Sequence, residues 1–170
     1  MPVLTEILQR YSCRAYQDKP IEQDKLDRII EAARLAPSAS NKQEWRFVFV
    51  RDAALRQQMQ VAASNQLFVG QAAVVIAACA ENDYVMRCGQ RCGPIDVAIA
   101  LEHVALQAAA EGLGTCWIGS FYPDQVRQIL GIPENVAVIE LMTLGYPTDR
   151  MRPKSRAAAE KIACYDRWGF

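Results

Sequence analysis

The sequence has no excess of charge of either sign, because its 19 lysine and arginine residues balance its 19 aspartate and glutamate residues. A protein without such an excess does not concentrate nucleic acid or an anionic membrane around itself, so neither is an expected partner. The sequence also has no apolar run of about 20 residues, the length that a membrane-spanning helix needs. No basic segment leads into an apolar run near its start. We therefore expect a cytoplasmic protein.

The motifs of several common enzyme classes are missing as well. The segment from Gly112 to Gly119 departs from the dinucleotide-binding fingerprint, because Trp117 stands where the third glycine should be. No Gly-Lys-Ser/Thr phosphate loop occurs, which disfavours a nucleoside triphosphatase. The single histidine, His103, lies within a predicted helix, and no serine or cysteine motif marks a nucleophile for it to activate. A hydrolase triad is therefore not expected.

The six cysteines do not form a disulfide or metal pattern. Cys79 lies inside an apolar run and Cys116 lies beside a tryptophan, which is typical of buried, reduced thiols. Cys88 and Cys92 resemble half of a metal site or a redox pair, but no second cysteine pair lies near them. We expect no metal, and a thiol or metal function at this pair is kept as an alternative.

The composition indicates one globular domain over residues 1–170, since 51% of the residues are hydrophobic and 22% are charged. No repeat, low-complexity tract or linker divides the chain. Hydrophobic periodicity and turn residues predict the order of the elements. Helices are predicted over 24–36, 53–63, 94 to about 111 and 123–130, and strands over 45–50, 73–78, 112–119 and 136–144.

The predicted helix that starts at Pro94 is apolar nearly all round. Such a helix cannot turn a large side toward water, so in a small domain it needs a cover on both sides. The sheet is one expected cover, and a partner subunit is the other.

Two basic clusters lie at opposite ends of the sequence, one in the segment Arg10-Tyr-Ser-Cys-Arg14 and one in Lys154-Ser-Arg156. Each alone is typical of solvated surface charge. Together they suit a phosphate monoester, because guanidinium groups, an ammonium group and a hydroxyl can donate charge-assisted hydrogen bonds to a dianion from several directions.

Four segments in this order resemble the FMN-dependent nitroreductase family: Arg10-x-Ser-x-Arg14, Ala-Pro-Ser-Ala-Ser-Asn-Lys-Gln-Glu-Trp over 36–45, Gly-Leu-Gly-Thr-Cys-Trp-Ile-Gly over 112–119, and Pro-Lys-Ser-Arg over 153–156. The resemblance covers nearly the whole chain. It implies an α+β sandwich with a mostly antiparallel central sheet flanked by helices. It also implies an interlocked homodimer with FMN at the interface, in which the tail over about 148–170 packs on the partner subunit.

The resemblance also assigns roles to individual residues. Arg10, Ser12, Lys154 and Arg156 would hold the FMN phosphate, and Arg14 would lie at the pyrimidine edge, where a cation favours negative charge on the ring. From the other subunit would come Pro37, Ser38 and Ser40 at the outer edge of the ring, with amide hydrogen bonds from Asn41 and Gln43. Asn65 or Gln66 would contact the pyrimidine, and the backbone of Ile118 and Gly119 would approach N5 and O4, a closeness that a residue without Cβ permits.

The implied function is a ping-pong oxidoreductase, in which NADH or NADPH reduces the flavin and a nitroaromatic, quinone or similar acceptor then enters the same pocket. The chain departs from the family pattern at Tyr11, often a basic residue, and at Glu44, where proline usually precedes the tryptophan. It is also short for the helical insertion that roofs the substrate pocket of longer members. Reductive dehalogenation, flavin fragmentation, and flavin binding or sensing without turnover are therefore kept as alternatives.

Overall fold

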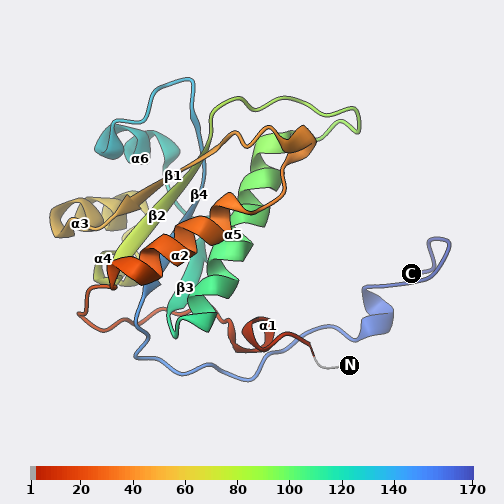
Figure 1. Cartoon of the computed structure of the whole chain (residues 1–170), viewed down its shortest axis with the longest axis horizontal. Helices are drawn as coiled ribbons and strands as arrows, with labels where there is room; N and C mark the ends of the chain where they lie inside the picture. The colour runs from red at the N-terminus through yellow and green to blue at the C-terminus, as the bar shows by residue number, and fades with distance from the viewer. Residues whose placement is uncertain (1–2) are drawn as a thin grey trace.

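A four-stranded antiparallel sheet with the strand order β1-β2-β4-β3 runs through the molecule, and helices lie on both of its faces (Figure 1). The computed structural model describes residues 3–170. The strands are β1 (Trp45–Val50), β2 (Val74–Ala80), β3 (Gly114–Ile118) and β4 (Ala137–Gly145). The α-helices are α1 (Thr5–Gln9), α2 (Gln23–Arg34), α3 (Ala53–Ala62), α4 (Leu67–Gln71), α5 (Cys92–Ala110) and α6 (Pro123–Leu130). Short 3₁₀ turns cover Ala39–Asn41 and Ala159–Lys161.

The predicted α+β class and the order of the long elements are confirmed, while several boundaries move. The first predicted helix ends at Arg34 rather than at residue 36, because Pro37 keeps the residue before it out of the helical region. The long helix begins at Cys92, before Pro94, since the Asp83 carboxylate accepts a hydrogen bond of 2.8 Å from the Gly93 N–H. The predicted strand over 112–119 is shorter and begins at Gly114, because Gly112 has a φ of 74° and ends the preceding turn.

The two faces of the sheet carry separate hydrophobic clusters. One cluster joins the sheet to α2 and α5 through residues such as Ile29, Ile76 and Leu101, and the other joins it to α3, α4 and α6 through residues such as Met59 and Val126. All residues of β2 are buried, as predicted, because β2 is a central strand with helices on both faces.

The edge strand β1 is less buried than its apolar sequence indicated. Val48 keeps 36% of its surface exposed, since β1 pairs only with β2. Among the described residues, no helix is long and apolar enough to cross a membrane.

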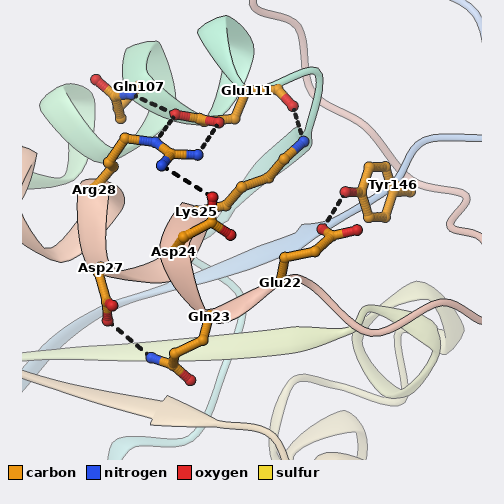
Figure 2. A network of polar contacts seen from close by, with 9 residues as sticks. All are labelled: Glu22, Gln23, Asp24, Lys25, Asp27, Arg28, Gln107, Glu111 and Tyr146. Atoms are coloured by element: carbon orange, nitrogen blue, oxygen red, sulfur yellow. Dashed lines mark hydrogen bonds and ion pairs between the residues drawn. The ribbon is translucent and has the colours of Figure 1, made fainter.

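A network of polar contacts fixes α2 against the end of α5 (Figure 2). The Arg28 guanidinium donates to both oxygens of the Glu111 carboxylate, with Nε–Oε1 at 2.5 Å and Nη2–Oε2 at 2.9 Å. Lys25 Nζ donates to the Glu111 carbonyl oxygen over 2.7 Å, which satisfies one of the backbone acceptors that a helix end leaves free. These contacts hold the two helices of one layer together.

The outward side of α5 leaves apolar residues uncovered. Pro94, Ile95 and Ala98 are exposed, with Ile95 at 40%, although α2 and the sheet bury most of the helix. The final segment of the chain passes α1 and then runs away from the rest of the molecule (Figure 1). Every residue from 150 to 170 is exposed.

Candidate functional site

The two ends of the chain meet at a cavity of about 500 Å³ with a strongly basic lining. Arg10, Ser12 and Arg14 line it from the N-terminal side, and Lys154 and Arg156 line it from the C-terminal side. The structure therefore brings together the two basic clusters that are predicted to bind a phosphate. Arg150 and Arg152 also line this cavity and were not among the predicted residues.

Among the residues that the structure describes, few anionic groups neutralise these cations. Glu102 lies 3.6 Å from Arg10, between the carboxylate Oε1 and Nε, and Asp149 is the one acidic residue among those that line the cavity. Lys154 Nζ donates to the Ile7 carbonyl oxygen over 2.6 Å. Burial, followed by repulsion from Arg10 and Arg156, lowers the pKa of Lys154. A ligand with negative charge would relieve this repulsion.

The N-terminal half of the cavity is attached to the outer edge of β3. Ser12 forms a parallel bridge with Thr115, and the Cys13 N–H donates to the Thr115 carbonyl oxygen over 2.9 Å. From Thr115, β3 continues to Ile118 at its end, a rise of about 10 Å at the usual spacing of a strand. One strand thus connects the basic cavity with the predicted contact at Ile118 and Gly119.

The end of β3 lies beside the turn that carries Asn65 and Gln66. The Gln66 side-chain amide donates to the Ser120 carbonyl oxygen over 3.2 Å, and the hydroxyls of Ser64 and Ser120 lie 3.1 Å apart. Ile118 is buried, whereas Gly119 is exposed and a Cβ built on it would have nothing within 4 Å. The backbone is therefore open to a ligand at Gly119.

Arg14 occupies the space between these two regions. It lines the basic cavity, and its guanidinium carbon lies 6.0 Å from the centre of the Phe68 ring in α4, which directly follows Gln66. Arg14 thus links the cavity to the start of α4, and its expected contact with the pyrimidine stays a prediction.

The predicted loop from Pro37 to Gln43 is folded tightly on itself. Ser40, Asn41 and Gln43 have positive φ values between 52° and 56°. The Gln43 N–H donates to the Ser38 hydroxyl over 3.0 Å, and the Gln43 side-chain amide donates to Asn41 Oδ1 over 3.1 Å. None of the residues from Pro37 to Gln43 lines the basic cavity, so the structure does not bring the two predicted sets together within one chain.

Asp96 fixes this loop to α5 and was missed in the sequence. It is 5% exposed, and both of its carboxylate oxygens lie 3.1 Å from the Ala39 N–H. A buried carboxylate that receives a backbone hydrogen bond holds the loop in one conformation. Its position in the first half of α5, where the neighbouring residues are apolar, is the signal that could have identified it.

The cysteines and the histidine do not form a second centre. All six cysteines are free, and Cys88 is exposed while Cys92 is buried at the start of α5. His103 Nδ1 lies 3.2 Å from the Ala32 carbonyl oxygen, an ordinary contact between α5 and α2. No group of three or more potential metal ligands occurs in the part of the chain that the structure describes.

The chain is similar in sequence to proteins of a known family. The model of the family described as "Nitroreductase family" matches residues 7–81 and 60–146. A Thermus thermophilus protein named NADH dehydrogenase is 32% identical, with 97% of this chain and 98% of that protein covered. A Bacillus subtilis protein named FMN reductase [NAD(P)H] is 29% identical, with 94% of this chain and 72% of that protein covered.

A solved structure is similar over almost the whole chain. It is described as the NADPH:FMN oxidoreductase from Vibrio harveyi complexed with NAD⁺, and it has a TM-score of 0.88 and 29% sequence identity. The similarity covers 96% of this chain and 76% of that chain. That structure thus shares the overall fold of this chain.

Proposed function

The chain belongs to the nitroreductase family, and we propose from this membership and its own geometry that it is an FMN-dependent NAD(P)H oxidoreductase. The observation that carries the proposal is the basic cavity, in which residues from both ends of the chain converge beside β3. The names of the relatives, which include FMN reductase and NADPH:FMN oxidoreductase, support FMN as the cofactor and a nicotinamide as the electron donor.

The donors in the cavity fit the phosphate of FMN. Arg10, Lys154 and Arg156 supply positive charge and Ser12 supplies a hydroxyl, which together match the negative charge and the acceptor oxygens of a phosphate monoester. Within residues 3–170, the one hydrogen bond that the Arg156 guanidinium donates goes from Nη1 to the carbonyl oxygen of the neighbouring Ser155, so its other donors are available to a ligand.

The end of β3 fits the ring of FMN. The backbone of Ile118 and Gly119 would meet the ring where Gly119 leaves open space, and the turn with Asn65 and Gln66 would offer amide groups to the pyrimidine. Arg14 would place its charge near the pyrimidine, where it would stabilise negative charge on the ring.

A second copy of the chain would complete this site. The loop from Pro37 to Gln43 lies outside the basic cavity of its own protomer, and we propose that it contacts the FMN of the partner. The uncovered apolar residues of α5, such as Ile95 and Ala98, support such an interface.

The C-terminal segment would take part in the same dimer. Ile162, Tyr165, Trp168 and Phe170 are 55–94% exposed, which is unfavourable for large apolar side chains in water. An apolar groove of about 630 Å³ between α1, α2 and α5 offers a surface for such a segment, with Leu4, Leu35 and Leu106 in its lining. We propose that each tail packs on the partner subunit.

FMN, when bound, supplies the chemistry of hydride transfer, and the chain supplies binding, orientation and electrostatics. The donor and then the acceptor would occupy the same place over the ring in a ping-pong sequence. The proposed acceptor is a nitroaromatic, a quinone or a similar small molecule. The six free thiols fit the reducing cytoplasm as the location of the protein.

The test is the visible absorption spectrum of the purified protein, followed under anaerobic conditions during addition of NADH or NADPH. We expect a flavin spectrum that bleaches with one of the two donors and returns when a quinone is added. Protein that contains FMN but is bleached by neither donor would contradict the oxidoreductase proposal and favour a flavin-binding protein without turnover. Protein that retains no FMN when supplied with an excess would contradict the site itself.

A further inference from the structure

Asp149 lies between the two basic segments and accepts hydrogen bonds from one of them. Its Oδ1 accepts from the Tyr11 hydroxyl over 2.9 Å and from the Cys13 thiol over 3.1 Å, and its Oδ2 accepts from the Arg14 N–H over 2.9 Å. These three donors alternate with Arg10, Ser12 and the side chain of Arg14, which line the cavity. The carboxylate thus holds the segment on which the predicted phosphate contacts are carried.

The backbone around Asp149 extends this attachment. The Tyr11 hydroxyl also lies 3.0 Å from the Asp149 carbonyl oxygen, and the Thr148 N–H donates to the Ala15 carbonyl oxygen over 2.9 Å. Beyond Asp149 the chain continues directly into the second basic segment, up to Arg156. The Asp149 carboxylate and these backbone contacts together fix the position of the two segments relative to each other, although the segments are distant in the sequence.

The protonation states agree with this arrangement at neutral pH. Burial and the hydrogen bond to Asp149 raise the pKa of Tyr11, and the same two causes raise the pKa of Cys13 to about 11. Burial alone would raise the pKa of Asp149, but the hydrogen bonds from Arg14, Cys13 and Tyr11 outweigh it and lower the pKa. The carboxylate is therefore ionised while both side-chain donors keep their protons.

We propose that Asp149 is a positioning residue for the cofactor phosphate, which acts by holding Arg10 and Ser12 opposite Lys154 and Arg156. This inference rests on the proposed function. Asp149 lines the same cavity, and its negative charge acts against a phosphate there, so a favourable effect on phosphate binding must pass through the residues that it holds. Its loss should weaken binding of the phosphate more than binding of the ring.

The test compares FMN with riboflavin, which has the same ring and no phosphate. Their dissociation constants are measured by quenching of flavin fluorescence for the full-length protein and for Asp149→Asn. The asparagine amide places an NH₂ group against either the Arg14 N–H or the Tyr11 and Cys13 donors, so one side of the attachment is lost. Arg156→Ala is the reference for direct loss of a phosphate contact.

We expect Asp149→Asn to weaken FMN binding about tenfold or more, as for the loss of a hydrogen bond to a charged group, and riboflavin binding by less than about threefold. Tyr11→Phe removes one hydrogen-bond donor and keeps the aromatic ring of the side chain. It should also weaken FMN binding more than riboflavin binding, by a smaller factor than Asp149→Asn. It also serves as the test if Asp149→Asn does not fold.

The matched control is Asp52→Ala, which removes the N-cap of α3, where Oδ1 accepts from the Leu55 N–H over 2.9 Å. This variant should melt at a lower temperature with both flavin affinities unchanged. Equal weakening of FMN and riboflavin in Asp149→Asn would overturn the positioning role and indicate a general loss of structure. An unchanged FMN affinity would overturn it as well. Failure of the wild-type protein to bind FMN would instead refute the proposed function.

Discussion

Replacement of Gly119 by alanine should have opposite effects on the stability of the fold and on the affinity of the proposed site for FMN. A Cβ at this position meets nothing within 4 Å, and Gly119 does not have a positive φ. Alanine is therefore tolerated in the protomer, and the loss of conformational freedom in the unfolded chain should stabilise it by about 0.4–1 kcal/mol. For a chain of this size the melting temperature should rise by roughly 1–4 °C.

The same methyl group should weaken binding of FMN, because the proposed contact needs the backbone of Gly119 next to the ring. Loss of one backbone hydrogen bond costs about 0.5–1.5 kcal/mol, which corresponds to an affinity about 2- to 12-fold lower, and displacement of the ring adds to this. The assays are thermal melting of the protein without FMN, followed by circular dichroism, and titration with FMN, followed by fluorescence.

Gly131→Ala is the matched control, since it makes the same chemical change in the C-cap of α6. Gly131 has a φ of 65°, so alanine there should cost roughly 1–2 kcal/mol of stability and leave the affinity for FMN unchanged. The two variants should thus show opposite patterns. Full affinity of Gly119→Ala for FMN would refute the placement of the ring at the end of β3.

Two further predictions concern the dimer and the dependence of stability on pH. Removal of residues 157–170 should lower the molar mass found by light scattering from that of a dimer toward that of a monomer, because it removes the exposed Tyr165, Trp168 and Phe170; an unchanged dimer would exclude a role for the tail. The hydrogen bond from Tyr146 is the largest of the causes that lower the pKa of Glu22 from 4.5 to about 2, so the stability that the ionised Glu22 contributes is present above pH 4.5 and is lost as the pH falls toward 2. The melting temperature of the wild type should therefore exceed that of Tyr146→Phe at pH 6, and the difference between the two melting temperatures should shrink between pH 4.5 and 2. A difference that stays constant over this pH range would contradict the prediction.

Elements with a local signal could be predicted from the sequence. The helix α6 is found with its predicted bounds, because Pro123 starts it and Gly131 stops it, and Asp52 caps α3 as expected. The helices α1 and α4 were missed, since five residues are too few to show a helical period and their stability comes from packing on the rest of the fold. Exposure of the edge strand β1 depends on strand order, which no local pattern contains.

In the candidate site, too, some residues could be predicted from a local motif and others could not. Arg10, Ser12 and Arg156 belong to short motifs, and the structure brings them to one cavity. Asp96 and Asp149 have no motif, because each acts on a backbone segment that lies far away in the sequence. Their roles depend on the tertiary structure, in which a carboxylate finds donors that only the fold places around it.

A site divided between two subunits links cofactor binding to association. If the loop from Pro37 to Gln43 contacts the FMN of the partner, FMN stabilises the dimer, by about 2.7 kcal/mol at a free concentration 100 times the dissociation constant. Removal of the tail should then weaken FMN binding together with the dimer, whereas Gly119→Ala acts on the ring directly. A truncated monomer that kept the full affinity for FMN would show that one protomer holds the cofactor alone. The assignment of the loop from Pro37 to Gln43 to the partner's site would then be wrong.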